Sequence, residues 1–354
     1  METLSSEGRM ESLKEHIYCC NAATEVLKFG QSNLLHASGC EESSSVLFLI
    51  IPGNPGIVGF YKTFMQVIYQ SFDKKYPVWA VSHAGHCVPP DVMDMKEDTN
   101  EAKLEDVFGL NGQVEHKLAF LKQYVPREVK LVLVGHSIGC YIILEIMKRD
   151  PLLQVLKSVL LFPTIERMAQ SPQGKLMTPM LCRLRYAMYV PIYLLSFLPE
   201  RVKASMVRLL LHRLQTLDES CVSATINLFS VDCTANAMYM GSQEMVQVMD
   251  RDNATIQENQ EKLANAMYMG SQEMVQVMDR DNATIQENQE KLIFYYGEND
   301  NWCPVQYYEE IKRDFPKADI RLCNKGIRHA FVLDAGRDVA LMMTEWLQKV
   351  LHSL

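Results

Sequence analysis

Residues 135–139 read Gly-His-Ser-Ile-Gly, and the sequence on both sides of them allows few folds. The apolar run 131–134 predicts a buried parallel strand, and apolar residues recur at helical spacing after the motif. A G-x-S-x-G motif between a strand and a helix predicts a sharp turn that holds Ser137 in a strained backbone conformation. The two glycines leave room for neighbouring backbone to pass close to this turn. Ser137 is therefore the candidate nucleophile, and the Ile138 N–H at the helix N-terminus is a candidate oxyanion donor.

A second apolar run, VLFLII at residues 46–51, predicts another buried strand, and a loop rich in glycine and proline follows at 52–56. In enzymes with this strand–turn–helix motif, the loop after such a strand supplies the second oxyanion donor. The Asn54 N–H is the candidate, because the nitrogen of Pro55 carries no hydrogen. An ordinary tight turn is the alternative interpretation of this loop.

Strand-like and helix-like segments alternate along much of the remaining chain, and such alternation is typical of a parallel sheet with helices on both faces. The pattern predicts further strands at 24–29, 78–81, 156–162, 293–297 and 319–323, and helices at 59–72, 106–124, 304–315 and 334–351. We therefore predict an α/β fold whose core comprises residues 1–163 and 293–354. Residues 164–292 interrupt the alternation and are expected to form an inserted helical lid.

The serine hydroxyl needs a general base, and the base needs a carboxylate that orients it. In this architecture the acid follows the serine along the chain and the histidine comes last. Asp300 is the best candidate acid, because it follows the next-to-last predicted strand, and Glu298 is the runner-up. His329 follows the last predicted strand and is the candidate base. His83 and His86 lie in a loop at the same end of the sheet and could line the pocket, but we assign neither a catalytic role.

The composition fits a globular protein, since 48% of the residues are hydrophobic and 22% are charged. A formal net charge of −8 does not imply any general affinity for nucleic acid, and we expect no nucleic-acid partner. Residues 1–16 are polar and mixed in charge, unlike a signal or transit peptide. The ten cysteines show no C-x-x-C spacing, so we expect reduced thiols facing the cytosol and no metal or cofactor.

Residues 176–215 of the predicted lid have the composition of a segment that binds a lipid surface. The charge-free stretch 186–199 is about half a bilayer span in helical length. Residues 201–215 are basic and amphipathic, as expected of an interfacial helix. Two arginines interrupt the apolar stretch and two prolines are expected to kink any helix there: Arg183, Arg185, Pro179 and Pro191. A lid helix packed on the core is the alternative interpretation.

Residues 235–263 are repeated without a single change as residues 264–292. Solenoid repeats diverge and need several copies to bury a core, so two identical copies indicate a recent tandem duplication or an assembly error. Only one copy can lead into the predicted strand at 293–297. We expect the other copy to be extruded as helical excess at the rim of the lid, because added loop length costs little free energy.

Several segments together resemble the lipid droplet-associated hydrolases. The matching segments are Ile50–Gly56, Gly109–Leu121, Lys130–Gly139, Leu160–Met168, Phe294–Pro304 and Arg328–Phe331. The resemblance implies an α/β-hydrolase fold and a serine hydrolase of lipid droplets and the endoplasmic reticulum, with ester lipids, including sterol esters, as the substrate class. It also supports Ser137, Asp300 and His329 as the triad. The family has one copy of the segment that is doubled here.

We therefore predict a serine lipid esterase that acts on the cytosolic face of droplets and the endoplasmic reticulum, with a lipid ester and the droplet surface as partners. A droplet-surface scaffold with a vestigial site is the alternative from another functional class. A thioester or small-ester substrate is a second alternative. Epoxide or haloalkane hydrolysis is disfavoured, because those related enzymes need a carboxylate where Ser137 stands.

Overall fold

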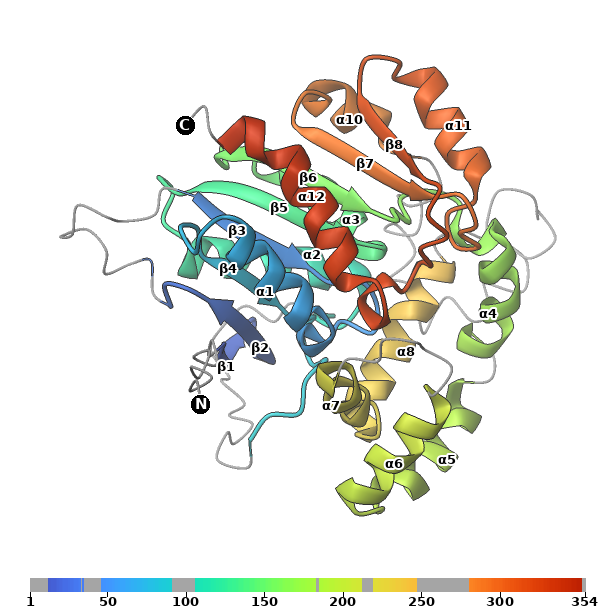
Figure 1. Ribbon diagram of the computed structural model, residues 1–354. Coiled ribbons are helices and arrows are strands. Elements are labelled where there is room, and N and C mark those ends of the chain that lie inside the picture. Colours follow the sequence, from blue (N-terminus) through green and yellow to red (C-terminus); the bar gives the residue numbers. More distant parts are fainter. Residues whose placement is uncertain are drawn as a thin grey trace, which may run out of the picture.

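An eight-stranded sheet forms the centre of the computed structural model, which describes residues 12–32, 34, 46–90, 106–182, 185–211, 219–246 and 280–351 (Figure 1). The strands are β1 (Leu13–Cys19), β2 (Ala22–Phe29), β3 (Val46–Ile51), β4 (Val78–Val81), β5 (Lys130–His136), β6 (Val155–Leu161), β7 (Leu292–Gly297) and β8 (Asp319–Cys323). Their order across the sheet is β1-β2-β4-β3-β5-β6-β7-β8. Strands β4, β3 and β5 to β8 pair in parallel, whereas β1 and β2 run antiparallel.

The predicted strands are all present, because the central strands consist largely of apolar residues that the sheet buries on both faces. All six residues of β3 and all four of β4 are buried. Strand β1 was not predicted from the sequence. It is an edge strand whose polar residues are mostly half-buried or exposed, so it lacks the apolar run that marks the others.

Helices cover both faces of the sheet, as the alternating pattern predicts. Helices α1 (Lys62–Ser71) and α12 (Gly336–Leu351) pack together on one face, while α2 (Leu110–Tyr124) and α3 (Ile138–Arg149) pack together on the other (Figure 1). Two further helices, α10 (Asn282–Asn288) and α11 (Val305–Asp314), flank β7 in the chain.

Two predicted helices begin three or four residues later than the sequence indicates. The segment predicted as 59–72 opens with the 3₁₀ turn η1 (Val58–Tyr61) before α1 begins. Helix α2 begins at Leu110 because the chain before it turns, and the carboxylate of Asp106 accepts a hydrogen bond from the Gly109 N–H. Terminal differences of this size do not change which face each helix covers.

The connection between β6 and β7 supplies a group of helices at one end of the sheet, which we call the inserted helices (Figure 1). They are α4 (Pro172–Cys182), α5 (Arg185–Ser196), α6 (Glu200–Leu210), α7 (Glu219–Asn227) and α8 (Val231–Val246), preceded by the short turn η2 (Met168–Gln170). Helix α8 packs against α4 and α5, and α7 packs against η1. Pro179 and Pro191 each lie inside a helix and do not end it. Among the described residues, no helix combines the length and apolar character needed to cross a membrane.

The described parts of the two tandem copies do not overlap. Residues 235–246 of the first copy form most of α8, and residues 280–292 of the second copy form α10 and lead into β7. Together they supply the two ends of a single copy. The predicted extrusion of the surplus copy concerns residues 247–279, which lie outside the described residues. The same is true of residues 1–11, Cys40, 91–105, Arg183 and 212–218.

Candidate active site

The turn between β5 and α3 holds Ser137 in the strained conformation that the sequence predicts. Its backbone has φ 54° and ψ −124°, in the region that side chains rarely adopt. The chain after β3 runs close beneath this turn, because a Cβ atom at Gly139 would lie 2.2 Å from the carbonyl oxygen of Ile51. Only glycine fits at that position, so the turn and the predicted oxyanion loop are held against each other.

Three loops at the C-terminal edge of the sheet bring Ser137, His329 and Asp300 together. The Ser137 hydroxyl oxygen lies 2.9 Å from Nε2 of His329, and Nδ1 of the same imidazole lies 2.6 Å from Oδ2 of Asp300. The loops follow β5, β8 and β7 respectively, which matches the order expected from the sequence. Asp300 is therefore the carboxylate beside the imidazole, whereas Glu298, the alternative acid, is exposed.

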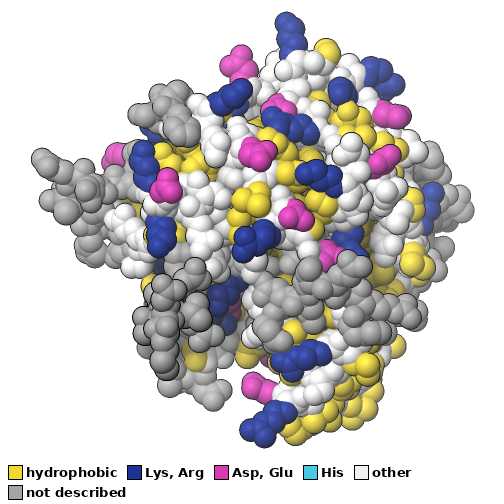
Figure 2. Space-filling view, viewed as in Figure 1, with side chains coloured by type: hydrophobic (Ala, Val, Ile, Leu, Met, Phe, Trp, Pro, Cys, Tyr) yellow, Lys and Arg dark blue, Asp and Glu magenta, His cyan; other side chains and the backbone are white. Residues whose placement is uncertain are grey.

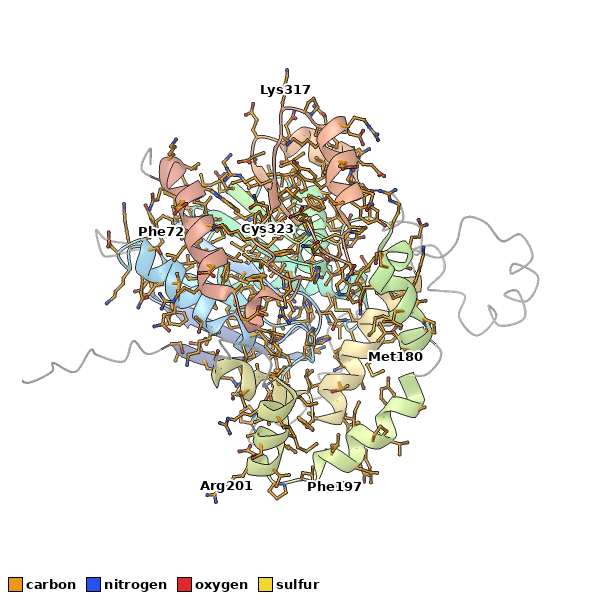
Figure 3. All side chains as sticks on the ribbon, turned by 45° about the vertical axis from the view of Figure 1, so that its right-hand side comes forward. Phe72, Met180, Phe197, Arg201, Lys317 and Cys323 are labelled. Atoms are coloured by element: carbon orange, nitrogen blue, oxygen red, sulfur yellow. The ribbon has the colours of Figure 1, made fainter. Side chains whose placement is uncertain are left out.

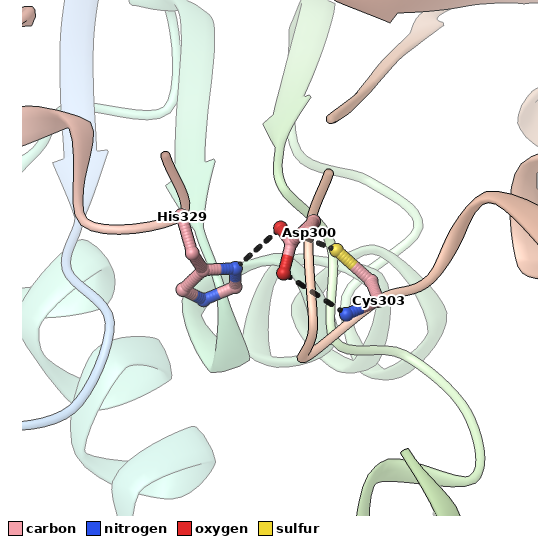
Figure 4. Close-up of side chains that lie close together, drawn as sticks. All are labelled: Asp300, Cys303 and His329. Atoms are coloured by element: carbon pink, nitrogen blue, oxygen red, sulfur yellow. Dashed lines mark hydrogen bonds and ion pairs between the residues drawn. The ribbon is translucent and has the colours of Figure 1, made fainter. Parts of the chain in front are cut away.

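The Asp300 carboxylate is held in place by several donors (Figure 4). Its Oδ1 accepts hydrogen bonds from the Trp302 and Cys303 N–H groups, and its Oδ2 accepts one from the Cys303 thiol at 3.0 Å. Burial alone would raise the pKa of Asp300, but the His329 charge and these hydrogen bonds lower it below its ordinary value. An ionised carboxylate at this position fixes the tautomer in which Nδ1–H of His329 donates and Nε2 accepts from the serine.

Asp300, Cys303 and His329 also form the only group of three described residues whose ligand atoms lie close enough to hold a metal ion, within 4.8 Å of one another. All three groups are joined by the hydrogen bonds described above. The hydrogen bonds that orient the imidazole therefore account for the closeness of these three groups.

The loop after β3 lies directly against the serine, since a Cβ atom at Gly53 would lie 2.9 Å from Cβ of Ser137. The N–H of Gly53 donates to the Tyr61 hydroxyl at 2.9 Å. The next N–H, that of Asn54, has no hydrogen-bond partner among the residues that the structure describes. It and the Ile138 N–H in the first turn of α3 are the two donors that the sequence predicts for an oxyanion.

A buried histidine inside the motif links the two sides of the site, and sequence reasoning gave it no role. Nε2–H of His136 donates to the His329 carbonyl oxygen at 2.9 Å, and its Nδ1 accepts from the Tyr61 hydroxyl at 2.7 Å. Burial lowers the pKa of His136 to about 3, so the imidazole is neutral and makes both bonds. Because Tyr61 also binds the Gly53 N–H, one chain of hydrogen bonds joins the loop of the catalytic imidazole to the oxyanion loop.

His83 and His86 pack behind the oxyanion loop, at Gly56. A Cβ atom at Gly56, whose φ is 74°, would lie 2.6 Å from the His83 ring. Nδ1 of His86 lies 2.7 Å from the Pro55 carbonyl oxygen, and burial lowers the pKa of His86 to about 4. Both side chains are buried, and their contacts support the loop.

The comparisons with known proteins agree with the resemblance found in the sequence. The family model described as lipid-droplet associated hydrolase matches residues 44–265 and 261–332, two ranges that overlap inside the tandem repeat. The chain is 57% identical over 349 residues to the lipid droplet-associated hydrolase of Gallus gallus, with 99% of each chain covered. It is 42% identical over 346 residues to the Homo sapiens protein of the same name, with 96% of each covered.

A solved structure identifies the fold class. The haloalkane dehalogenase DbeA from Bradyrhizobium elkani superposes with a TM-score of 0.57 at 12% identity, covering 97% of this chain and 100% of that one. Identity this low shows the fold alone, which is the α/β-hydrolase fold predicted from the strand–turn–helix motif. The family match over most of the chain is the stronger finding. The chain therefore belongs to the lipid droplet-associated hydrolase family, a family of hydrolases associated with lipid droplets.

Proposed function

We propose that this protein is a serine esterase that hydrolyses carboxylic ester lipids at the droplet surface. The observation that carries the proposal is the continuous chain of hydrogen bonds from the Ser137 hydroxyl through His329 to Asp300. A serine alcohol is a poor nucleophile near neutral pH, and this arrangement supplies both the base and its orienting carboxylate.

We propose the following roles for these groups. Nε2 of His329 takes the serine proton as Ser137 Oγ attacks the ester carbonyl, and the same proton then passes to the leaving alcohol. The Ile138 and Asn54 N–H groups stabilise the tetrahedral oxyanion, each lowering the barrier by about 3 kcal/mol. A water molecule, activated by the same imidazole, then releases the acid from the acyl-enzyme. No step needs a metal or an organic cofactor.

An exposed apolar face on α5 and α6 supports a droplet-binding role for the inserted helices. Figure 2 shows hydrophobic side chains gathered at the bottom of the molecule, where these helices lie, with basic side chains beside them. The large apolar residues that are more than two-fifths exposed on these two helices and the turn between them are Val190, Tyr193, Leu194, Phe197, Val202, Leu209 and Leu210. A patch of this kind on a hydrolase of the droplet family fits insertion into a lipid monolayer.

The position and charge of this face fit the same role. Phe197 and Arg201 lie at the tip of the inserted helices, remote from Lys317 at the opposite end of the molecule (Figure 3). Lys203 joins the two helices by donating to the Ser196 carbonyl oxygen at 2.8 Å. Basic residues beside an apolar face favour anionic lipid head groups. We therefore propose the cytosolic surfaces of droplets and the endoplasmic reticulum as the location, and sterol esters as the substrate class that the family resemblance favours.

Labelling with a fluorophosphonate probe tests the nucleophile. We expect the wild-type protein to be labelled and Ser137→Ala to be unlabelled, because the probe reacts with an activated serine. Ser205→Ala, which changes an exposed serine on α6, is the matched control and keeps full labelling. Equal labelling of wild type and Ser137→Ala would refute the assignment. Hydrolysis assays of the purified protein against separate lipid classes, sterol esters and triacylglycerols among them, then identify the substrate.

A droplet-surface scaffold remains the second candidate, because the apolar face on α5 and α6 exists independently of the triad. Expressing Ser137→Ala and a deletion of residues 176–215 in lipid-loaded cells separates the two functions. An esterase loses its effect on stored lipid with either change. A scaffold keeps its effect with Ser137→Ala and loses it only with the deletion.

A further inference from the structure

Helix α8 lies directly on the loop that carries the proposed oxyanion donor. The side-chain amide of Asn54 donates from Nδ2 to the Ala237 carbonyl oxygen at 2.8 Å and to Oε1 of Glu244 at 3.1 Å. A Cβ atom at Gly241, between these two partners on the helix, would lie 3.1 Å from the same Nδ2. The side chain of Asn54 is therefore tied to α8, while its backbone N–H remains free to act on a substrate.

Glu244 is an unusual residue for its position. It is 1% exposed, on a helix packed against α4 and α5. Burial raises the pKa of its carboxyl to about 8, and no ion pair with a cation is found for it in the described part of the chain. The carboxyl is therefore neutral at pH 7. Burying such a group costs free energy unless its hydrogen bonds are used, and an apolar residue would pack here at lower cost.

We propose that Glu244 is a positioning residue, which holds Asn54 so that the oxyanion hole is complete only while α8 is docked. The inference rests on the proposed esterase function and adds a second requirement to it. The Asn54 amide has two acceptors on one face of α8, and two bonds fix the orientation of a side chain where one leaves it free to rotate. A displacement of about 1 Å in a transition-state donor is enough to lower a rate by up to a hundredfold.

Helix α8 also lies between the active site and the exposed apolar face on α5 and α6. Helix α5 carries part of the exposed apolar face and packs against α8. A lipid surface that engages α5 is thus separated from the oxyanion loop by a single helix. The sequence gives no sign of this link, because Asn54 and Glu244 are far apart in the chain and belong to no shared motif.

Two substitutions at Glu244 separate positioning from packing. Glu244→Gln keeps an oxygen acceptor in a neutral side chain, whereas Glu244→Leu keeps similar bulk and loses the acceptor. With p-nitrophenyl butyrate as substrate, we expect Glu244→Leu to lower kcat by about tenfold or more with little change in KM, and Glu244→Gln to stay within about threefold of wild type. Glu287→Leu, an exposed change on α10, is the matched control.

Asn54→Ala removes the same hydrogen bonds from the other side and keeps the backbone N–H. We expect it to lower kcat as much as Glu244→Leu, and the double variant to lose no more than either single variant. Inhibition by butylboronic acid, which forms a tetrahedral adduct with the serine, should weaken in parallel with kcat. This readout reports the oxyanion hole, and a loss of fold stability alone would leave the folded fraction with normal inhibition.

The outcomes are distinct from those that test the esterase proposal. Wild-type protein that neither hydrolyses esters nor reacts with a fluorophosphonate contradicts the proposed function itself. An active wild type with unchanged kcat in Glu244→Leu overturns the positioning role. So does an equal loss in Glu244→Gln and Glu244→Leu, because glutamine supplies the required acceptor. If Glu244→Leu does not fold, Asn54→Ala and Glu244→Gln decide the question by the same criteria.

Discussion

The sheet core and the inserted helices solve different problems with different kinds of residue. The core places its reactive groups at the ends of buried strands, where Asp300 has no exposed side-chain surface and His329 only 15%. The inserted helices expose large apolar side chains such as Leu209 and Leu210, at 71% and 73%. We propose that the first region fixes geometry for chemistry and that the second presents a surface to lipid. The two functions should therefore be separable by mutation.

The largest effect is expected in the core, from Asp300→Asn. An amide at this position leaves the imidazole near the serine but favours the wrong tautomer, so kcat should fall by about 10⁴. Ester hydrolysis by purified protein measures the change, and binding to droplets should be unchanged. Glu298→Gln is the matched control, because Glu298 is exposed, whereas Asp300 is buried and bonded to His329. Comparable losses in both variants would remove Asp300 from its proposed role.

The next effect is expected in the inserted helices, from Phe197→Ser combined with Leu210→Ser. Each side chain contributes about 1.5–3 kcal/mol when fully buried, so droplet binding should weaken about a hundredfold or more. Flotation with artificial droplets measures the binding, and hydrolysis of a soluble ester should stay near wild type.

Leu152→Ser is the control for this pair. Leu152 is 76% exposed in the turn between α3 and β6, outside the inserted helices. We expect its loss to leave droplet binding intact. Equal weakening by the control would mean that exposed apolar residues anywhere on the surface contribute, and the division between the two regions would fail.

A smaller effect is expected from His136→Phe, which keeps a ring in the core and removes two hydrogen bonds. The loop that carries His329 then loses the hydrogen bond to its carbonyl oxygen, and kcat should fall by about tenfold. Tyr61→Phe removes only the bond to His136 and the acceptor for Gly53, and we expect a comparable loss. Wild-type rates in both variants would show that the linking chain does not position the catalytic groups.

The substitution His136→Phe also has a predictable effect on stability at acidic pH. The folded-state pKa of His136 is lowered to about 3, so the neutral form is favoured by folding. Its contribution to the free energy of unfolding is complete above pH 6.5 and is lost as the pH falls from 6.5 towards 3. As the pH is lowered from 7.5 to 4, the melting temperature should therefore fall less steeply for His136→Phe than for wild type.

The smallest effect is expected from deleting residues 247–275, which restores a single copy of the repeated segment. The deletion removes none of the described residues of α8, α10 or β7. We expect activity within about twofold of wild type and an unchanged melting temperature, because loop length alone costs little free energy. A large loss would show that the doubled segment has become part of the active structure.

The sequence predicts much of the core because its signals are local. Strand β4 was predicted with its observed bounds, since a short apolar run between turn residues needs no distant partner to be recognised. One motif and the order of loops along the chain predicted the three side chains that the structure brings together, Ser137, Asp300 and His329. Strand β1 was missed because its polar edge sequence lacks a local strand signal and is stabilised by pairing with β2.

The supporting contacts of the site were not predictable in the same way. The Tyr61–His136 bond and the Asn54–Glu244 bond join residues 75 and 190 positions apart, and neither pair has a characteristic spacing. The buried state of Glu244 also depends on how α8 packs, which periodicity alone does not determine. Such residues become visible only when the chain is folded.

Described elements of the fold come from both tandem copies, and this has a consequence for how the sequence evolves. Residues 235–246 come from one copy and residues 280–292 from the other, so described elements of the fold draw on both copies. Purifying selection should act on the start of the first copy and the end of the second.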